Sequence, residues 1–293
     1  MKKILILIES ILMIVVLAAI SILIAGIALP EWSAAVLTVV PLFALLLFVA
    51  ILALYRDPST YNQRGLARAR KGDQTGAIAN LTRAIELNPN FAEAYLNRGF
   101  VRREGDLAGA IADYTRAIEL NPASVAAYVN RGVLLDEQGN RADAIADYSR
   151  AIELDPDLAA AYVNRGVVQA KQGYLDGAIA DFDRAIEINP RLALTYVNRG
   201  FARARKGDRA GAIADYDEAI CLSPTDADKA WVHACRGVAH AAMGDTPAAC
   251  ESLAAAIALD PQWRDRARTE PQFDPIRHEP CFQALIAEPT TSP

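Results

Sequence analysis

The sequence contains only four cysteines, all in its last third: Cys221, Cys235, Cys250 and Cys281. None of them forms a C-x-x-C motif, and their density is too low for a disulfide framework. We therefore expect small buried thiols in a reducing compartment.

Histidine is also scarce, with three residues in the chain. A zinc site at His233, Cys235 and His240 is the alternative for the cysteine-containing region, because His233 and His240 lie seven apart on one face of an expected helix. Cys235 falls on a different face, and no second cluster completes four ligands. The sequence therefore predicts no metal site.

Sequence signatures of enzymes are absent. The chain has no phosphate-binding G-x-x-x-x-G-K, no G-x-S-x-G, no H-E-x-x-H and no dinucleotide fingerprint. Scattered histidines offer little for acid-base chemistry. We predict a protein that is not an enzyme, with no cofactor and no evident small-molecule substrate.

No basic stripe is present. The charges of residues 1–55 sum to zero, so the net charge of −5 lies on residues 56–293. Nucleic-acid binding depends on cationic side chains that neutralise phosphates. The acidic body therefore favours protein partners over nucleic acid.

The chain does contain a repeated unit, best seen between Ala126 and Leu158. Tyr128 and Gly132 are followed 34 residues later by Tyr162 and Gly166. Apolar residues recur at helical spacing in each half of the unit, and a fixed period of this length indicates an array of helical hairpins. Gly139 can adopt a left-handed conformation that ends the first helix, and Pro156 ends the second. Small residues such as Gly132 let the two helices approach closely.

These positions carry a family resemblance. The order aromatic, Gly, Gly, Ala, aromatic, Ala, Pro resembles the tetratricopeptide repeat, with one copy made of Tyr128, Gly132, Gly139, Ala144, Tyr148, Ala151 and Pro156. Six copies, the last one looser, cover residues 61–262. The resemblance implies an all-α fold, a tetratricopeptide α-solenoid whose hairpins must stack to bury their apolar faces.

Two apolar stretches precede the repeats, at residues 4–29 and 34–54. Each is long enough to cross a bilayer, so we expect a transmembrane helical hairpin within residues 1–55 and a polar connector at residues 56–60. The loop between the stretches has no Lys or Arg, whereas basic residues flank both outer ends, which predicts an integral protein of the inner or plasma membrane with cytoplasmic termini and repeats. Cleavage of residues 1–29 as a signal peptide is the alternative. Glu9 fits a position near the headgroups.

Residues 263–287 do not continue the repeat and are expected to form helices that cap the array. Residues 288–293 read as a disordered tail.

A row of asparagines is the first candidate binding site. Four copies place Asn two residues after the aromatic, at Asn97, Asn130, Asn164 and Asn198. Carboxamides donate and accept hydrogen bonds, so such a row can pair with the backbone of an extended peptide. The row resembles the asparagine ladder of the O-linked N-acetylglucosamine transferase superhelix, which implies a peptide groove on the concave face. Apolar residues that precede three of these asparagines could add pockets: Val129, Val163 and Val197. Alternatively, the amides satisfy neighbouring groups of the fold.

A row of arginines follows the asparagines and includes Arg131, Arg165 and Arg199. These side chains could bind carboxylates of a partner. The structural alternative, which we favour, pairs them with an acidic row in the second helices: Asp113, Asp147, Asp181 and Asp215.

The sequence thus predicts a membrane-anchored tetratricopeptide scaffold that binds a partner peptide or segment on its concave face. The alternative is a regulatory or assembly subunit of a membrane transport or envelope-biogenesis complex, docked through its spans. The identity of the partner does not follow from the sequence.

Overall fold

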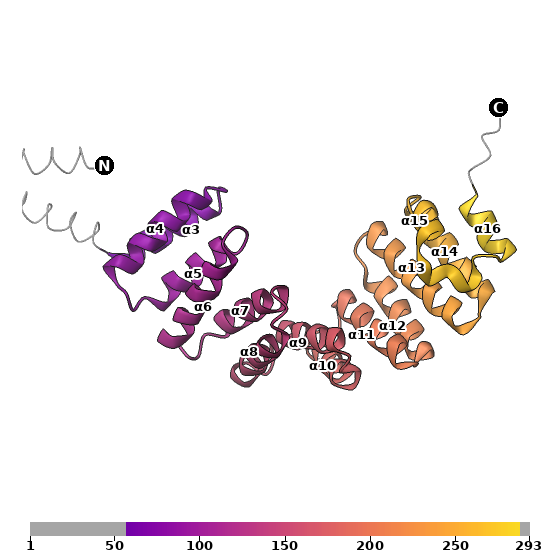
Figure 1. Ribbon diagram of the computed structural model, residues 1–293, viewed down its shortest axis with the longest axis horizontal. Coiled ribbons are helices and arrows are strands. Elements are labelled where there is room, and N and C mark those ends of the chain that lie inside the picture. Colours follow the sequence, from indigo (N-terminus) through magenta and orange to yellow (C-terminus); the bar gives the residue numbers. More distant parts are fainter. Residues whose placement is uncertain (1–56, 288–293) are drawn as a thin grey trace, which may run out of the picture. The chain divides into compact units, whose positions relative to one another are not determined.

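The computed structural model describes residues 57–287, and within them the secondary structure is helical, with no strand. By its contacts the chain divides into two compact units, Met1–Asp113 and Tyr114–Pro293, and the boundary falls inside α6 (Figure 1). The fold that the sequence predicts for its repeats, paired helices in a stacked array, is present in the described residues.

Within residues 57–113, the first unit contains three complete helices and the start of a fourth: α3 (Pro58–Ala69), α4 (Gln74–Leu87), α5 (Ala92–Arg102) and α6 (Leu107–Leu120). Helix α3 begins earlier than the sequence suggests, because Asp57 accepts hydrogen bonds from the amides of Ser59 and Thr60 and Pro58 occupies the first turn. Residues 58–60, assigned to the connector, are therefore helical. Hydrogen bonds from the Ser59 hydroxyl, the Ser59 amide and the Thr60 hydroxyl lower the pKa of the Asp57 carboxyl.

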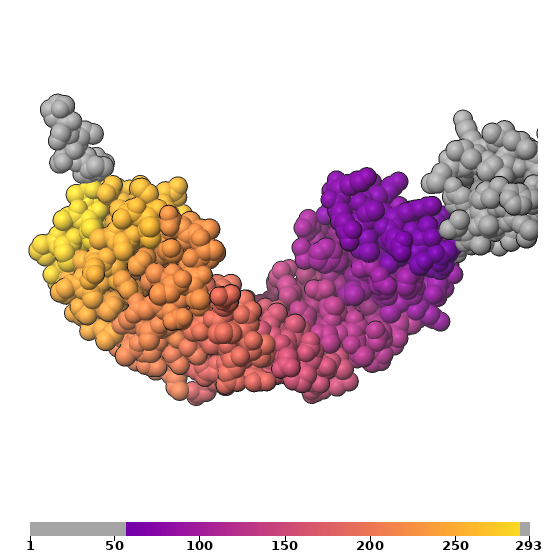
Figure 2. Space-filling model, turned by 180° about the vertical axis from the view of Figure 1, so that it is seen from behind, coloured from indigo at the N-terminus to yellow at the C-terminus, as the bar shows by residue number. Residues whose placement is uncertain are grey.

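The second unit contains four helical hairpins after the end of α6: α7 (Val125–Glu137) with α8 (Arg141–Leu154), α9 (Ala159–Gln172) with α10 (Leu175–Ile188), α11 (Ala193–Lys206) with α12 (Arg209–Leu222), and α13 (Asp226–Met243) with α14 (Thr246–Leu259). Each helix packs on its partner in the hairpin, and the second helix packs on the first helix of the next hairpin. In the space-filling view these hairpins form a continuous packed surface, from magenta to yellow (Figure 2).

Glycine ends the first helices of this unit as expected. Gly139 has a φ of 83°, and Gly173 and Gly207 have φ values of 88° and 96°. This left-handed conformation is open to glycine because it has no Cβ.

A second glycine row sets the distance between the two helices of a hairpin. A Cβ added to Gly132 would lie 2.8 Å from Cε1 of Tyr148, and one added to Gly166 would lie 2.8 Å from Cε1 of Phe182. Both rings are almost fully buried. The predicted close approach at Gly132 is confirmed, and its physical basis is a ring seated directly on the glycine.

Three short elements follow the last repeat: α15 (Trp263–Thr269), the 3-10 helix η1 (Pro271–Ile276) and α16 (Pro280–Ile286). They bury Phe273, Ile276 and Phe282 against Leu253 of α14. We call residues 263–287 the cap, and they cover apolar side chains of the last repeat.

The predicted transmembrane stretches, the possible cleavage of residues 1–29, Glu9 and the tail at residues 288–293 lie outside the described residues. Among residues 57–287, no helix is both long and apolar enough to cross a bilayer.

Candidate functional site: the asparagine face

The first helix of each hairpin presents one polar and two mostly apolar positions on the same face. Taking each asparagine of the row as position i, the residues at i−4 and i+3 share its side of the helix. In α11 these residues are Leu194, Asn198 and Phe201. We call this surface of α7, α9 and α11, together with the adjoining start of α13, the asparagine face of the second unit.

The asparagines of this face make no internal hydrogen bond. Asn130, Asn164 and Asn198 are half-buried, and within residues 57–287 their side chains have no hydrogen-bonding partner. A carboxamide that is partly removed from water normally pairs with another polar group. These three side chains therefore offer free donors and acceptors at a partly desolvated surface.

Asn97, in the first unit, behaves differently. Its Nδ2 donates to Oδ1 of Asn62 at 2.9 Å, and Nδ2 of Asn62 donates to Oε1 of Glu93 at 3.0 Å. The amide of Asn97 is therefore hydrogen-bonded to a neighbouring side chain of the fold, as the alternative for this row proposed.

Large apolar side chains gather where α11 meets α13. Leu194, Phe201 and Trp231 expose 59%, 38% and 37% of their surface, although such residues are normally buried. The rings of Phe201 and Trp231 lie 6.1 Å apart. Leu194 and Trp231 also line a cavity of about 290 Å³ near the start of both helices.

A second, smaller cavity of about 160 Å³ lies between α9 and α11. Asn198 and Phe201 line it together with Lys171 and Arg205. Nζ of Lys171 lies 2.6 Å from Oδ2 of Asp136, and Nη1 of Arg205 donates to the carbonyl of Ala170 at 2.6 Å. Side chains that enter this cavity from a partner would therefore meet apolar, amide and cationic groups.

The three valines of the row differ in exposure. Val129 and Val163 are half-buried and pack on the core of their repeats. Val197 is only 1% exposed and belongs to the core cluster that contains Tyr216, although it borders the larger cavity. Its side chain therefore offers a partner almost no exposed surface.

The arginine row is engaged inside the fold. Nε and Nη2 of Arg165 donate to the two carboxylate oxygens of Asp181 at 2.9 and 2.7 Å, and Nη1 donates to Oγ of Ser149 at 3.0 Å. Arg165 thereby joins the second helix of its own hairpin to that of the preceding one. The same arrangement holds Arg98 on Asp113, Arg131 on Asp147 and Arg199 on Asp215.

Both partners of these pairs are poorly exposed, at 20% for Arg165 and 8% for Asp181. The hydrogen bonds that Arg131 and Arg165 donate to Asp147 and Asp181 raise the pKa of the two guanidinium groups. The guanidinium planes also lie near tyrosine rings of their own helices, at 5.8 Å between Arg165 and Tyr162. The arginines of this row therefore pair with the aspartates of the second helices, which is the structural role considered for them from the sequence.

The cysteines depart from the expectation of buried free thiols. Cys250 of α14 and Cys281 of α16 form a disulfide, and Cys221 is exposed. Only Cys235 fits the expectation, and burial raises the pKa of its thiol to about 12. The sequence could not indicate the pairing, because it arises where the cap folds back onto α14. No group of three metal-ligating side chains occurs among residues 57–287.

The aromatic part of the site was not among the predicted binding residues. Phe201, and Phe100 in the first unit, stand three residues after an asparagine, where two other repeats have Val133 and Val167. A phenylalanine at a position where other repeats have valine was the feature of the sequence that could have indicated these residues.

Comparison with known proteins agrees with the geometry. A family model described as TPR repeat matches residues 65–104, 102–139 and 135–173, and one described as Tetratricopeptide repeat matches residues 159–192. The chain therefore carries tetratricopeptide repeats, as its sequence predicts. No curated protein sequence matches the chain.

Solved structures give the same assignment. The MamA protein is 28% identical with a TM-score of 0.53, and the match covers 56% of this chain and 91% of that one. YrrB, described as a TPR protein with an unusual peptide-binding site, is 25% identical with a TM-score of 0.53, over 60% of this chain and 91% of its own. Pseudomonas aeruginosa pilF, at 19% identity and a TM-score of 0.59, covers 74% of this chain and 94% of its own, and it shows the fold alone.

Proposed function

We propose that this protein is a scaffold whose asparagine face binds an extended segment of a partner protein. The observation that carries the proposal is the set of unpaired amides at Asn130, Asn164 and Asn198. Each carboxamide can donate to a peptide carbonyl and accept from a peptide N–H, so three of them in successive repeats can hold a backbone irrespective of its side chains. The description of YrrB as a peptide-binding TPR protein supports this reading by similarity.

Selectivity would come from the neighbouring apolar residues. Leu194, Phe201 and Trp231 are exposed at one end of the face and border its two cavities. Aromatic side chains in such positions contribute much of the binding free energy at protein interfaces. A partner segment with a bulky apolar residue fits the cavity between Leu194 and Trp231.

The test is a triple substitution, Asn130→Ala, Asn164→Ala and Asn198→Ala, in the full-length chain. Loss of one hydrogen bond per amide, at about 1 kcal/mol each, should weaken partner binding roughly 100-fold. The urea unfolding midpoint should hardly change, because the amides have no internal partner. The matched control is Asn140→Ala, which removes an exposed carboxamide that makes no cap bond at the start of α8.

Two results would contradict the proposal. One is undiminished partner capture by the triple variant. The other is a loss of stability as large as the loss of binding, which would assign the amides to the fold.

The proposal includes an anchor. Two apolar stretches within residues 1–55, and the basic residues that flank them, support a membrane-embedded hairpin with the repeats on the cytoplasmic side. Protease added to sealed vesicles tests this: digestion of the repeats from the non-cytoplasmic side alone would refute the orientation. A variant that lacks residues 1–55 should keep its soluble partner, and its loss would favour docking through the spans instead.

A further inference from the structure

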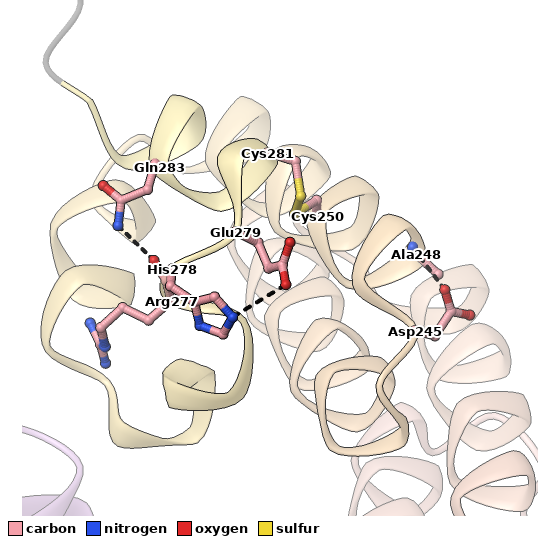
Figure 3. Close-up of a disulfide and its surroundings, with 8 residues drawn as sticks. All are labelled: Asp245, Ala248, Cys250, Arg277, His278, Glu279, Cys281 and Gln283. Carbon is pink, nitrogen blue, oxygen red and sulfur yellow. Dashed lines mark hydrogen bonds and ion pairs between the residues drawn. A yellow bond between two sulfur atoms is a disulfide. The ribbon is translucent and has the colours of Figure 1, made fainter.

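The cap is attached to the last repeat by one covalent bond and by a shared apolar cluster that includes Leu253, Phe273 and Phe282. The disulfide joins Cys250, in α14, to Cys281, at the start of α16, with a Cα–Cα distance of 6.1 Å (Figure 3). The two cysteines are separated by 31 positions in the sequence. The bond therefore closes a loop that contains α15 and η1.

Besides the disulfide, helix α16 is held by one buried ring, two partly buried side chains and a few hydrogen bonds. Phe282 is fully buried, with its ring 5.6 Å from that of Phe273, whereas Leu285 and Ile286 are only partly buried. Nε of Arg264 donates to the carbonyl of Leu285 at 3.1 Å, and Nε of Arg268 donates to that of Ile286 at 2.9 Å.

A helix of seven residues is far below the length at which helices persist alone in water. If α16 separates from α14, it unfolds. The helical state of α16 therefore depends on its attachment to α14, to which the disulfide contributes.

The bond is open to exchange from one side. Cys281 is exposed, whereas Cys250 is only 6% exposed and belongs to the apolar cluster beneath the cap. An external thiolate can reach Sγ of Cys281, form a mixed disulfide with it and release Cys250 as a thiolate. A second thiol then frees Cys281, so one disulfide is reduced to two thiols while two external thiols are oxidised to a disulfide.

We propose that the Cys250–Cys281 pair is a redox switch that controls attachment of α16 to the last repeat. In the oxidised form α16 covers Phe273 and the neighbouring apolar residues of α14. In the reduced form α16 opens and uncovers them. Re-formation of the bond uses a disulfide of the glutathione type as oxidant, which takes up the two electrons.

The cytoplasmic location expected for the repeats determines which form of the switch is the resting state. Thiols are kept reduced in that compartment, and disulfides there are usually transient. The open form is then the resting state, and oxidation closes the cap. The inference does not require a ligand on the asparagine face.

The first test compares hydrogen exchange in the full-length protein, oxidised and reduced. It uses the Cys221→Ser and Cys235→Ser double variant, in which the cap disulfide is the only redox-active pair. Reduction should accelerate exchange of the amides of residues 281–287 by roughly tenfold or more and leave residues 126–222 unchanged. Unchanged exchange in residues 281–287 would overturn the proposal, and so would unfolding of the whole of α13 and α14.

A second variant tests the effect of losing the disulfide independently of the redox conditions. Cys250→Ser with Cys281→Ser should exchange like the reduced protein under both conditions. If this variant fails to fold, the reduced form of the first variant still gives the measurement.

The second test traps thiols in intact cells with an alkylating reagent, before and after addition of a thiol oxidant. The proposal predicts alkylation of both cysteines before the oxidant and of neither after it. A bond that is complete in both samples would show a permanent structural disulfide and would overturn the switch.

Discussion

At the residue scale, the arginine and asparagine rows lie side by side in the sequence but differ in their surroundings. Arg165 has each of its donor groups engaged by the second helices of two hairpins, whereas Asn164 beside it has no partner within residues 57–287. A residue whose hydrogen bonds are complete inside the fold contributes to stability. One whose hydrogen bonds are not complete is available to a ligand.

The buried pairs give the first prediction. Asp181→Asn leaves the volume of the side chain unchanged but deprives the poorly exposed Arg165 of its counter-charge, so it should lower the free energy of unfolding by about 3 kcal/mol. Urea denaturation measures the change. Glu187→Gln in the same helix is the matched control, because its pair with Arg184 is exposed, and it should cost less than about 0.5 kcal/mol. Equal effects of the two substitutions would contradict this assignment.

His233 gives a prediction for pH. It occupies the position that holds tyrosine in earlier repeats, and burial, followed by the charge of Arg236, lowers its pKa below 6.5. The unfolded state therefore binds the proton first as pH falls, so stability decreases from about pH 6.5 down to the lowered pKa of the folded state. His233→Tyr should remove this part of the pH dependence.

The measurement for His233 is the difference in unfolding free energy between pH 7.5 and pH 5.5. It should be larger for the parent protein than for His233→Tyr. The same difference in both proteins would show that His233 does not contribute.

At the scale of the element, the distance between the two helices of a hairpin depends on a glycine of the first helix that contacts an aromatic ring of the second. Gly166→Ala would place a Cβ 2.8 Å from the buried ring of Phe182. Overpacking of this kind costs roughly 1–3 kcal/mol, and the better helix propensity of alanine offsets about 1 kcal/mol of it. We expect a net loss of up to about 2 kcal/mol.

The matched control is Gly105→Ala, because nothing lies within 4 Å of the added Cβ and the backbone there is not left-handed. Its effect on thermal unfolding should stay within about 0.5 kcal/mol. If Gly166→Ala were equally harmless, the ring would not set the spacing of the hairpin.

Much of this element could be predicted from the sequence, because the determining residues recur. The period of 34 residues repeats the pair Gly132 and Tyr148 as Gly166 with Phe182 and as Gly200 with Tyr216. The left-handed Gly139 follows from glycine at a helix end. The start of α3 was harder, since the cap bonds of Asp57 to Ser59 and Thr60 turn a polar connector into a first helical turn.

Features that occur once could not be predicted in this way. The bond between Cys250 and Cys281 requires α16 to return to α14, and no spacing in the sequence encodes that return. Phe201 stands where the neighbouring repeats have Val133 and Val167, and this spacing alone does not indicate an exposed ring. Its exposure beside Trp231 becomes evident only when two hairpins are in place.

At the scale of the molecule, the repeats bury their apolar faces only by stacking. The same stacking therefore provides the stability of the fold and forms the asparagine face. Successive first helices of the second unit bring Asn130, Asn164 and Asn198 onto a shared surface, and the cap closes the apolar end of the array. The asparagine face would lose its order if the hairpins separated.

The central claim, that this face binds a partner segment, is tested most directly by photo-crosslinking. A photoreactive phenylalanine analogue at position 201 should form a covalent adduct with the bound partner, and the same analogue at Tyr174 should not. Tyr174 is a matched aromatic control because it is 64% exposed and stands at the turn between α9 and α10. An adduct from position 201 alone is the predicted result. Adducts of equal yield from both positions, or none from position 201 while the partner still co-purifies, would contradict the account.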